Sequence, residues 1–206
     1  MSLTNCYVTL EDIKTRLGGA TVDGGDPQLE ARITSACRAI DVHCGQFFYD
    51  AGSASARTFR PRSNTRLKVD PFSTTTGLIV KSDTSDDGTY ATTWASTDYE
   101  VDYFGDNPSY PFDTIEAVGS YTFPIYYRRR RTVQVTARWG WSAVPQNVLE
   151  AATILSVDLW KRKDTPFGIA TGSVDFGGLR IGRDVMAQVA SLLQTFVRVD
   201  RMIGIA

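Results

Sequence analysis

The sequence predicts an α+β protein, an α-helical bundle of about three to four helices with an inserted antiparallel β region. Apolar residues recur at helical spacing before residue 45 and again after residue 145. Between these segments, short alternating runs are separated by Gly, Pro, Asn and Asp, which is typical of antiparallel strands. We therefore expect residues 1–49 and 141–206 to form the helical core and residues 50–140 to form the insertion.

Two helices are expected in the N-terminal part of the chain. Thr4 or Thr9 is placed to cap a short helix that runs through Arg16. A longer helix then runs from Asp26 to Gly45. Its apolar residues follow three-and-four spacing, which places them on one face against a partner element: Leu29, Ile33, Cys37, Ile40 and Cys44.

The insertion is expected to contain short strands joined by turns. Asp86, Asp87 and Gly88 lie between two apolar runs and predict a hairpin turn, because Gly readily adopts positive φ. Alternating apolar and polar residues predict strands at 56–59, 67–69, 77–82, 90–94, 99–103, 114–118 and 132–139.

Two further helices are expected after the last strand. That strand runs through Trp139-Gly140-Trp141 to Pro145, whose fixed φ suits the first turn of a helix. We expect this helix to extend to Lys163. A final helix, from Arg183 to Met202, carries an apolar stripe that suits either the core or a partner groove.

Composition excludes some functional classes. A chain of 206 residues with 42% apolar content can bury a sizeable core. The net charge of -1 provides no overall attraction to DNA, so any contact with DNA must be local. No segment has the pattern of a secretory leader or the length of a membrane span. We expect a protein of the cytosol with no membrane partner.

No group of side chains predicts catalysis, a cofactor or a metal site. Cys6, Cys37 and Cys44 lack zinc-ligand spacing, and they predict neither zinc nor a disulfide. His43 is the sole histidine and is interpreted as a polar residue near a helix end. Turn chemistry and strand alternation explain the two acidic clusters, Asp83/Asp86/Asp87 and Asp98/Glu100/Asp102. We therefore assign no catalytic residue and do not expect an enzyme.

One pronounced run of positive charge consists of Arg128, Arg129, Arg130 and Arg131, preceded by Tyr126 and Tyr127. Guanidinium groups bind phosphates, and aromatic rings stack on bases. A charged strand edge also protects a sheet against aggregation. The run is interpreted either as a solvated hairpin end or as an edge that contacts DNA or an acidic protein.

Residues 165–182 form a Gly-rich arm or loop within the core. They lack the Gly-Lys-Ser/Thr of a phosphate loop and are too apolar for a plain linker. Two interpretations stay open, a packed loop and an arm that orders against another subunit. The candidate contact residues of this arm and of the last helix are Phe167, Ile169, Val174, Phe176, Leu179, Ile181, Phe196, Met202 and Ile203.

The order and spacing of these features resemble the head-tail connector proteins of long-tailed bacteriophages, also called adaptor or head-completion proteins. The similarity rests on residues 8–14, the helix that closes at 44–48, the junction at 140–145 and the helix that closes at 159–163. It covers most of the chain.

This resemblance implies a structural virion protein of the neck, assembled in the host cytoplasm. It implies a homo-oligomeric ring under the portal that extends the DNA channel and provides the platform for a stopper or tail-completion protein. The ring would be a dodecamer in the virion, with a monomer as the isolated form, and it would allow non-specific contact with packaged DNA. Two alternatives stay open: another neck or tail structural protein, such as a tail-side completion protein, and a metal-dependent nuclease.

Overall fold

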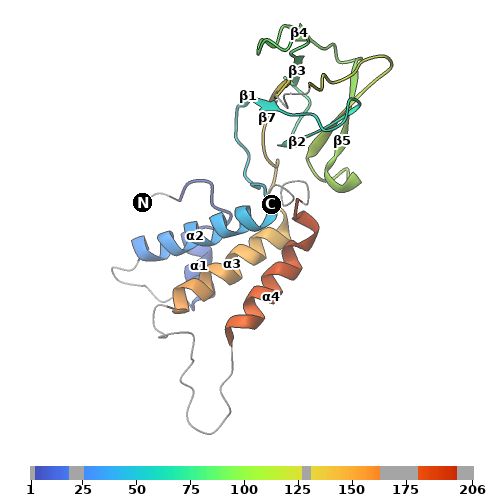
Figure 1. The fold of residues 1–206 in the computed structure, drawn as a ribbon. Coiled ribbons are helices and arrows are strands. Elements are labelled where there is room, and N and C mark those ends of the chain that lie inside the picture. The colour runs from blue at the N-terminus through green and yellow to red at the C-terminus, as the bar shows by residue number, and fades with distance from the viewer. Residues whose placement is uncertain (1–2, 19–25, 127–130, 163–180, 199–206) are drawn as a thin grey trace. The chain divides into compact units, whose positions relative to one another are not determined.

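The computed structural model describes residues 3–18, 26–126, 131–162 and 181–198. Within these residues it contains four α-helices and two antiparallel sheets, which confirms the predicted α+β class (Figure 1). The chain divides into two compact units, one comprising residues 1–49 and 144–206 and the other comprising residues 50–143. We call them the helical unit and the β unit.

The helical unit contains α1 (Leu10–Arg16), α2 (Asp26–Cys44), α3 (Gln146–Lys161) and α4 (Ile181–Leu193), followed by the 3-10 turn η4 (Gln194–Phe196). Thr9 caps α1, because its Oγ1 accepts the Asp12 N–H at 3.1 Å and the Asp12 carboxylate accepts the Thr9 N–H at 2.9 Å. This reciprocal capping box selects Thr9 over Thr4 as the start of the helix.

The last helix is shorter than predicted. We expected it to continue to Met202, but α4 ends at Leu193 and Val197 has extended backbone angles. The chain that follows α4 forms hydrogen bonds with the end of α2 and does not continue the helix. The Gln46 side-chain amide donates to the Phe196 carbonyl at 2.6 Å, and the Arg198 N–H donates to the Cys44 carbonyl at 2.9 Å.

The core of the helical unit lies around α3, which contacts α1, α2 and α4 (Figure 1). The predicted apolar stripe of α2 is confirmed, since its five members are at most 1% exposed. α2 packs against α3, whose buried residues are Val148, Ala151, Ala152, Leu155, Ser156 and Trp160. Burial of these two stripes is the main apolar stabilisation of the unit.

The β unit contains two sheets. One has the strand order β1 (Ala54–Phe59), β7 (Val133–Arg138), β3 (Ile79–Ser82), β4 (Thr92–Thr93), and the other has the order β2 (Arg66–Phe72), β6 (Phe112–Ala117), β5 (Tyr99–Tyr103). The seven predicted strands all overlap these strands. β4 is shorter than the predicted 90–94, because the preceding chain turns, with the Ala91 N–H bonded to the Thr89 carbonyl at 3.0 Å.

Trp139 joins the two sheets of the β unit. It follows β7 and forms an antiparallel bridge with Phe72 at the end of β2. Its ring lies 5.6 Å from the Phe59 ring and 6.2 Å from the Phe72 ring, and its Nε1 donates to the Ser55 carbonyl at 2.7 Å. The side chain is fully buried, so the indole belongs to the core that both sheets share.

We expect Ile40→Ala to lower the free energy of unfolding by about 2–5 kcal/mol, because it leaves a cavity between α2 and its neighbours. Val42→Ala is the matched control, since Val42 lies on the same helix but is 82% exposed. That change should alter stability by less than about 0.5 kcal/mol. Urea unfolding followed by far-UV circular dichroism measures both. Equal losses would contradict the described packing of α2.

The Asp50–Arg138 ion pair predicts acid sensitivity of the β unit. Arg138 bonds both carboxylate oxygens of Asp50, at 2.8 and 2.5 Å, and these hydrogen bonds lower the pKa of Asp50. A carboxylate with a lowered pKa stabilises the folded state at pH values above its unfolded-state pKa of about 4. This stabilisation is lost as the pH falls through its pKa in the folded state. Asp50→Asn should therefore be less stable than wild type at pH 7, and the difference should shrink toward pH 3. Glu100→Gln, an exposed carboxylate of β5, is the control in urea titrations. A difference that does not depend on pH would contradict this role of the pair.

Candidate interaction surface

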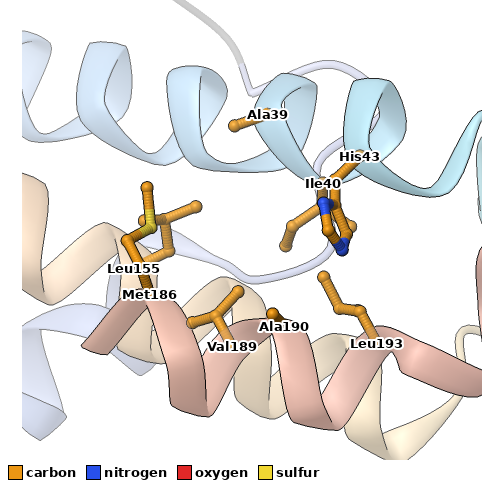
Figure 2. Close-up of a pocket in the computed structure, with 8 residues that line it drawn as sticks. All are labelled: Ala39, Ile40, His43, Leu155, Met186, Val189, Ala190 and Leu193. Atoms are coloured by element: carbon orange, nitrogen blue, oxygen red, sulfur yellow. The ribbon is translucent and has the colours of Figure 1, made fainter. Parts of the chain in front are cut away.

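An apolar hollow of about 90 Å³ opens between three helices of the helical unit. In Figure 2, Ile40 and His43 point from α2 toward α4, and Val189 and Leu193 point from α4 toward α2. The complete lining is Ala39, Ile40, His43, Leu155, Met186, Val189, Ala190 and Leu193. Because small-molecule sites usually have volumes of about 300–1,000 Å³, this hollow suits a protein side chain better than a ligand.

The surface around the hollow is exposed and poor in charge. Met186 is 54% exposed at its rim, and Val42, one turn along α2 from Ala39, is 82% exposed. Residues 185–197 of α4 and the turn that follows include no Asp, Glu, Lys or Arg. By contrast, α1 places two acidic residues in its first turn and two basic residues in its last. We call Ala39, Val42, His43, Met186 and Ala190 the α2/α4 surface.

The sequence prediction did not include this surface, although two signals for it are present. Met186 shares one face of α4 with the buried Val189 and Leu193, yet it is 54% exposed. Val42 lies off the buried stripe of α2. Large apolar residues that stay exposed beside a buried stripe are typical of a surface that meets another protein.

The predicted contact residues fall partly within the described chain. Ile181 begins α4. Phe196 is 2% exposed, and its ring contacts the Phe48 ring at 5.6 Å, so it contributes to the core of the helical unit. The others lie outside the described residues: Phe167, Ile169, Val174, Phe176, Leu179, Met202 and Ile203.

The chain is anchored on both sides of the arginine run. Arg128, Arg129 and Arg130 lie outside the described residues, whereas Arg131 is described and exposed. Before the run, the Tyr126 hydroxyl donates to the Thr84 carbonyl at 2.6 Å. After it, the Arg131 carbonyl accepts from the Tyr90 hydroxyl at 2.8 Å.

Within the described residues, the acidic clusters serve local structure. Burial raises the pKa of Asp83, but the N–H groups of Gly88, Asp87 and Ser85 bond its carboxylate and bring the pKa below its usual value. Asp86 and Gly88 have positive φ, as the predicted turn requires. The described part of the chain contains no group of three His, Cys, Asp or Glu residues able to hold a metal ion.

The second acidic cluster does not converge on one site. Asp98 accepts the Ala95 N–H at 2.7 Å, and Asp102 lies 3.7 Å from Arg66. Glu100 is exposed on β5. Asp98 and Asp102 therefore have separate partners, and the nuclease alternative gains no support from these carboxylates. Among the described helices, none is long and apolar enough to cross a membrane.

Comparison with known proteins identifies structural neighbours. The sequence matches no family model, and no curated protein matches it. A chain from the neck of an empty gene transfer agent (GTA) particle, computed with C6 symmetry, has a TM-score of 0.53 and 18% identity over 97% of this chain and 93% of its own. A chain from the neck of a native GTA particle, computed with C12 symmetry, has a TM-score of 0.52 and 16% identity with the same coverage.

A third neighbour comes from the virion of a native GTA particle, with a TM-score of 0.52 and 17% identity over 93% of this chain and 92% of that chain. These likenesses span both units of the chain. They establish that the protein has the fold of neck proteins from phage-like particles, which confirms the predicted resemblance at the level of fold.

Proposed function

We propose that the protein is a structural component of the neck of a phage-like particle, acting as a head-tail connector. It forms a ring under the portal, extends the DNA channel and provides the platform for a stopper or tail-completion protein. One observation carries this proposal: the fold of neck chains extends over 97% of the sequence. In this function the protein acts by binding other proteins and does no chemistry of its own. Its location is the virion neck, reached after assembly in the host cytoplasm.

The oligomer is a homomeric ring. The neck chains with this fold come from particles computed with C6 and C12 symmetry, which supports a cyclic assembly and a dodecamer in the virion. The helical unit acts as the connector core, and the β unit is an insertion within its sequence. A ring that closes on a portal template leaves the isolated chain free to be a monomer.

The α2/α4 surface is the contact between neighbouring copies. A cyclic ring uses head-to-tail contacts, so each copy needs an accepting surface and an inserting one. The hollow at α2, α3 and α4 is apolar, sized for a side chain and surrounded by exposed Met186 and Val42. An uncharged surface is suited to a partner surface that also lacks charge, because burial then desolvates no ion.

Two further contacts complete the proposal. The arm at 165–182 and the end of the chain, with Met202 and Ile203, meet the portal or an adjacent subunit. Arg128, Arg129, Arg130 and Arg131 form an edge toward packaged DNA or an acidic partner. Because the net charge is -1, the protein as a whole does not attract phosphate. Contact with DNA therefore takes place at a local cationic edge such as this one.

The first experiment mixes the purified chain with the portal ring of the same particle and images the product by electron microscopy. We expect a second ring, of matching symmetry, stacked on the portal. The position of the β unit in that ring shows which face carries the arginine run. Binding to tail components, with no association to the portal, would instead establish a tail-side completion protein.

A charge placed on the α2/α4 surface should block assembly without unfolding the chain. Met186→Glu introduces a carboxylate that a subunit contact would have to desolvate, at a cost of several kcal/mol. Gln188→Glu is the matched control, since Gln188 is exposed on the same helix but does not line the hollow. We expect ring formation on the portal to be lost in the first variant and kept in the second, with both circular dichroism spectra unchanged. Normal rings of Met186→Glu would refute the assignment of this surface.

A further inference from the structure

We propose that Cys6 and Cys37 are a site of disulfide formation, which links the N-terminal segment covalently to α2 when a peroxide oxidant reaches the protein. The two residues lie far apart in the sequence, and the fold brings them together. The bond itself concerns the helical unit alone, and only its formation in a released particle rests on the proposed function.

Backbone and side-chain contacts bring Cys6 against the turn of α2 that ends at Cys37. The Tyr7 N–H donates to Cys37 Sγ at 3.3 Å, and this nitrogen is bonded directly to the carbonyl carbon of Cys6. Cys6 Sγ lies 3.8 Å from Thr34 Oγ1, which is one helical turn before Cys37 on α2.

The segment around Cys6 is held against α2 at several points. The Tyr7 hydroxyl bonds to the Asp41 carboxylate and accepts the Phe48 N–H at 3.0 Å. The Arg38 guanidinium donates to the Asn5 carbonyl at 2.6 Å. Because a disulfide forms only where two backbones approach closely, a segment that is held against α2 in this way favours the bond.

The two cysteines have different exposure, which assigns an order to the reaction. Cys6 is half-buried and is the thiol that peroxide reaches, whereas Cys37 is fully buried. The Cys6 thiolate attacks one peroxide oxygen and breaks the O–O bond, giving a sulfenic acid and a hydroxide that takes up a proton. Cys37 then loses its proton and attacks the Cys6 sulfur, and the hydroxide that leaves becomes water. Overall, two thiols and hydrogen peroxide give one disulfide and two waters.

Burial raises the pKa of Cys37 to about 12, so little of its thiolate is present near pH 7. The second step is therefore expected to limit the rate and to accelerate as pH rises.

Cys44 provides an internal control. It is also fully buried, burial raises its pKa to about 12 as well, and its charged neighbour is Asp41, not a thiol.

The site fits a protein that leaves the cytoplasm. Glutathione and thioredoxin keep cytosolic thiols reduced, whereas disulfides persist at virion surfaces. The chain would therefore be reduced during assembly and oxidised in the released particle. The bond would close a loop that contains α1 and would fasten this helix to α2, raising the Tm of the helical unit.

The test treats the reduced full-length chain with hydrogen peroxide, alkylates the remaining thiols and digests with trypsin. The three cysteines fall in separate peptides, 1–14, 33–38 and 39–57. We expect peptides 1–14 and 33–38 to be joined, with the intact mass lowered by about 2 Da and the bond reversed by dithiothreitol. Cys44 should be alkylated.

Variants separate this site from general thiol oxidation. Cys44→Ser should keep the linked peptides, while Cys6→Ser should lose them completely and lose the rise in Tm on oxidation. Cys6→Ser changes a half-buried residue and leaves the buried Cys37 in place, so the test does not depend on a core substitution. Over-oxidised Cys6 beside an alkylated Cys37, or a dimer linked through Cys6 of two chains, would overturn the proposal.

Discussion

The β unit depends on the burial of one indole. Trp139 is fully buried, and its contacts reach β1 through Phe59 and Ser55 and reach β2 through Phe72. The Arg57 guanidinium stacks 4.7 Å from the ring centre and is itself bonded to Asp70 of β2 at 2.7 Å. A large aromatic core residue stabilises by several kcal/mol, and here that energy holds two sheets together. The Trp139 carbonyl accepts the Ala51 N–H at 2.9 Å, so the segment where the chain enters the β unit is bonded to the segment where it leaves.

Local periodicity predicted the elements but not their partners. In β7, Val133, Val135 and Ala137 are fully buried and the residues between them are not, so alternation identified the strand and its inner face. Alternation does not say that β7 lies between β1 and β3, because that order depends on pairing between distant segments. The end of α4 was missed for a related reason. Helical spacing continues past Leu193, but backbone bonds to Gln46 and Cys44 end the helix.

The candidate sites were harder to predict than the fold because each one joins separate elements. The hollow combines residues 39–43 of α2, Leu155 of α3 and residues 186–193 of α4. In the sequence, Ile40, Leu155 and Leu193 are ordinary members of apolar stripes. Similarly, Cys6 and Cys37 gave no spacing signal, and an odd number of cysteines argued against a disulfide. The absence of charge in residues 185–197 was visible in the sequence, but only the structure shows which face of α4 is open.

The size of the hollow also bears on how a ring would assemble. A hollow of about 90 Å³ accepts little more than one side chain, so by itself it would hold a neighbouring copy only weakly. At about 25 cal/mol per Å² of buried apolar surface, one inserted aliphatic side chain contributes roughly 1.5–3 kcal/mol, well short of the association entropy of two proteins. A closed ring has one contact for every subunit. A portal template would impose the symmetry and raise the local concentration of copies. In the proposed connector, weak contacts of this kind would leave the chain a monomer until the portal template is present.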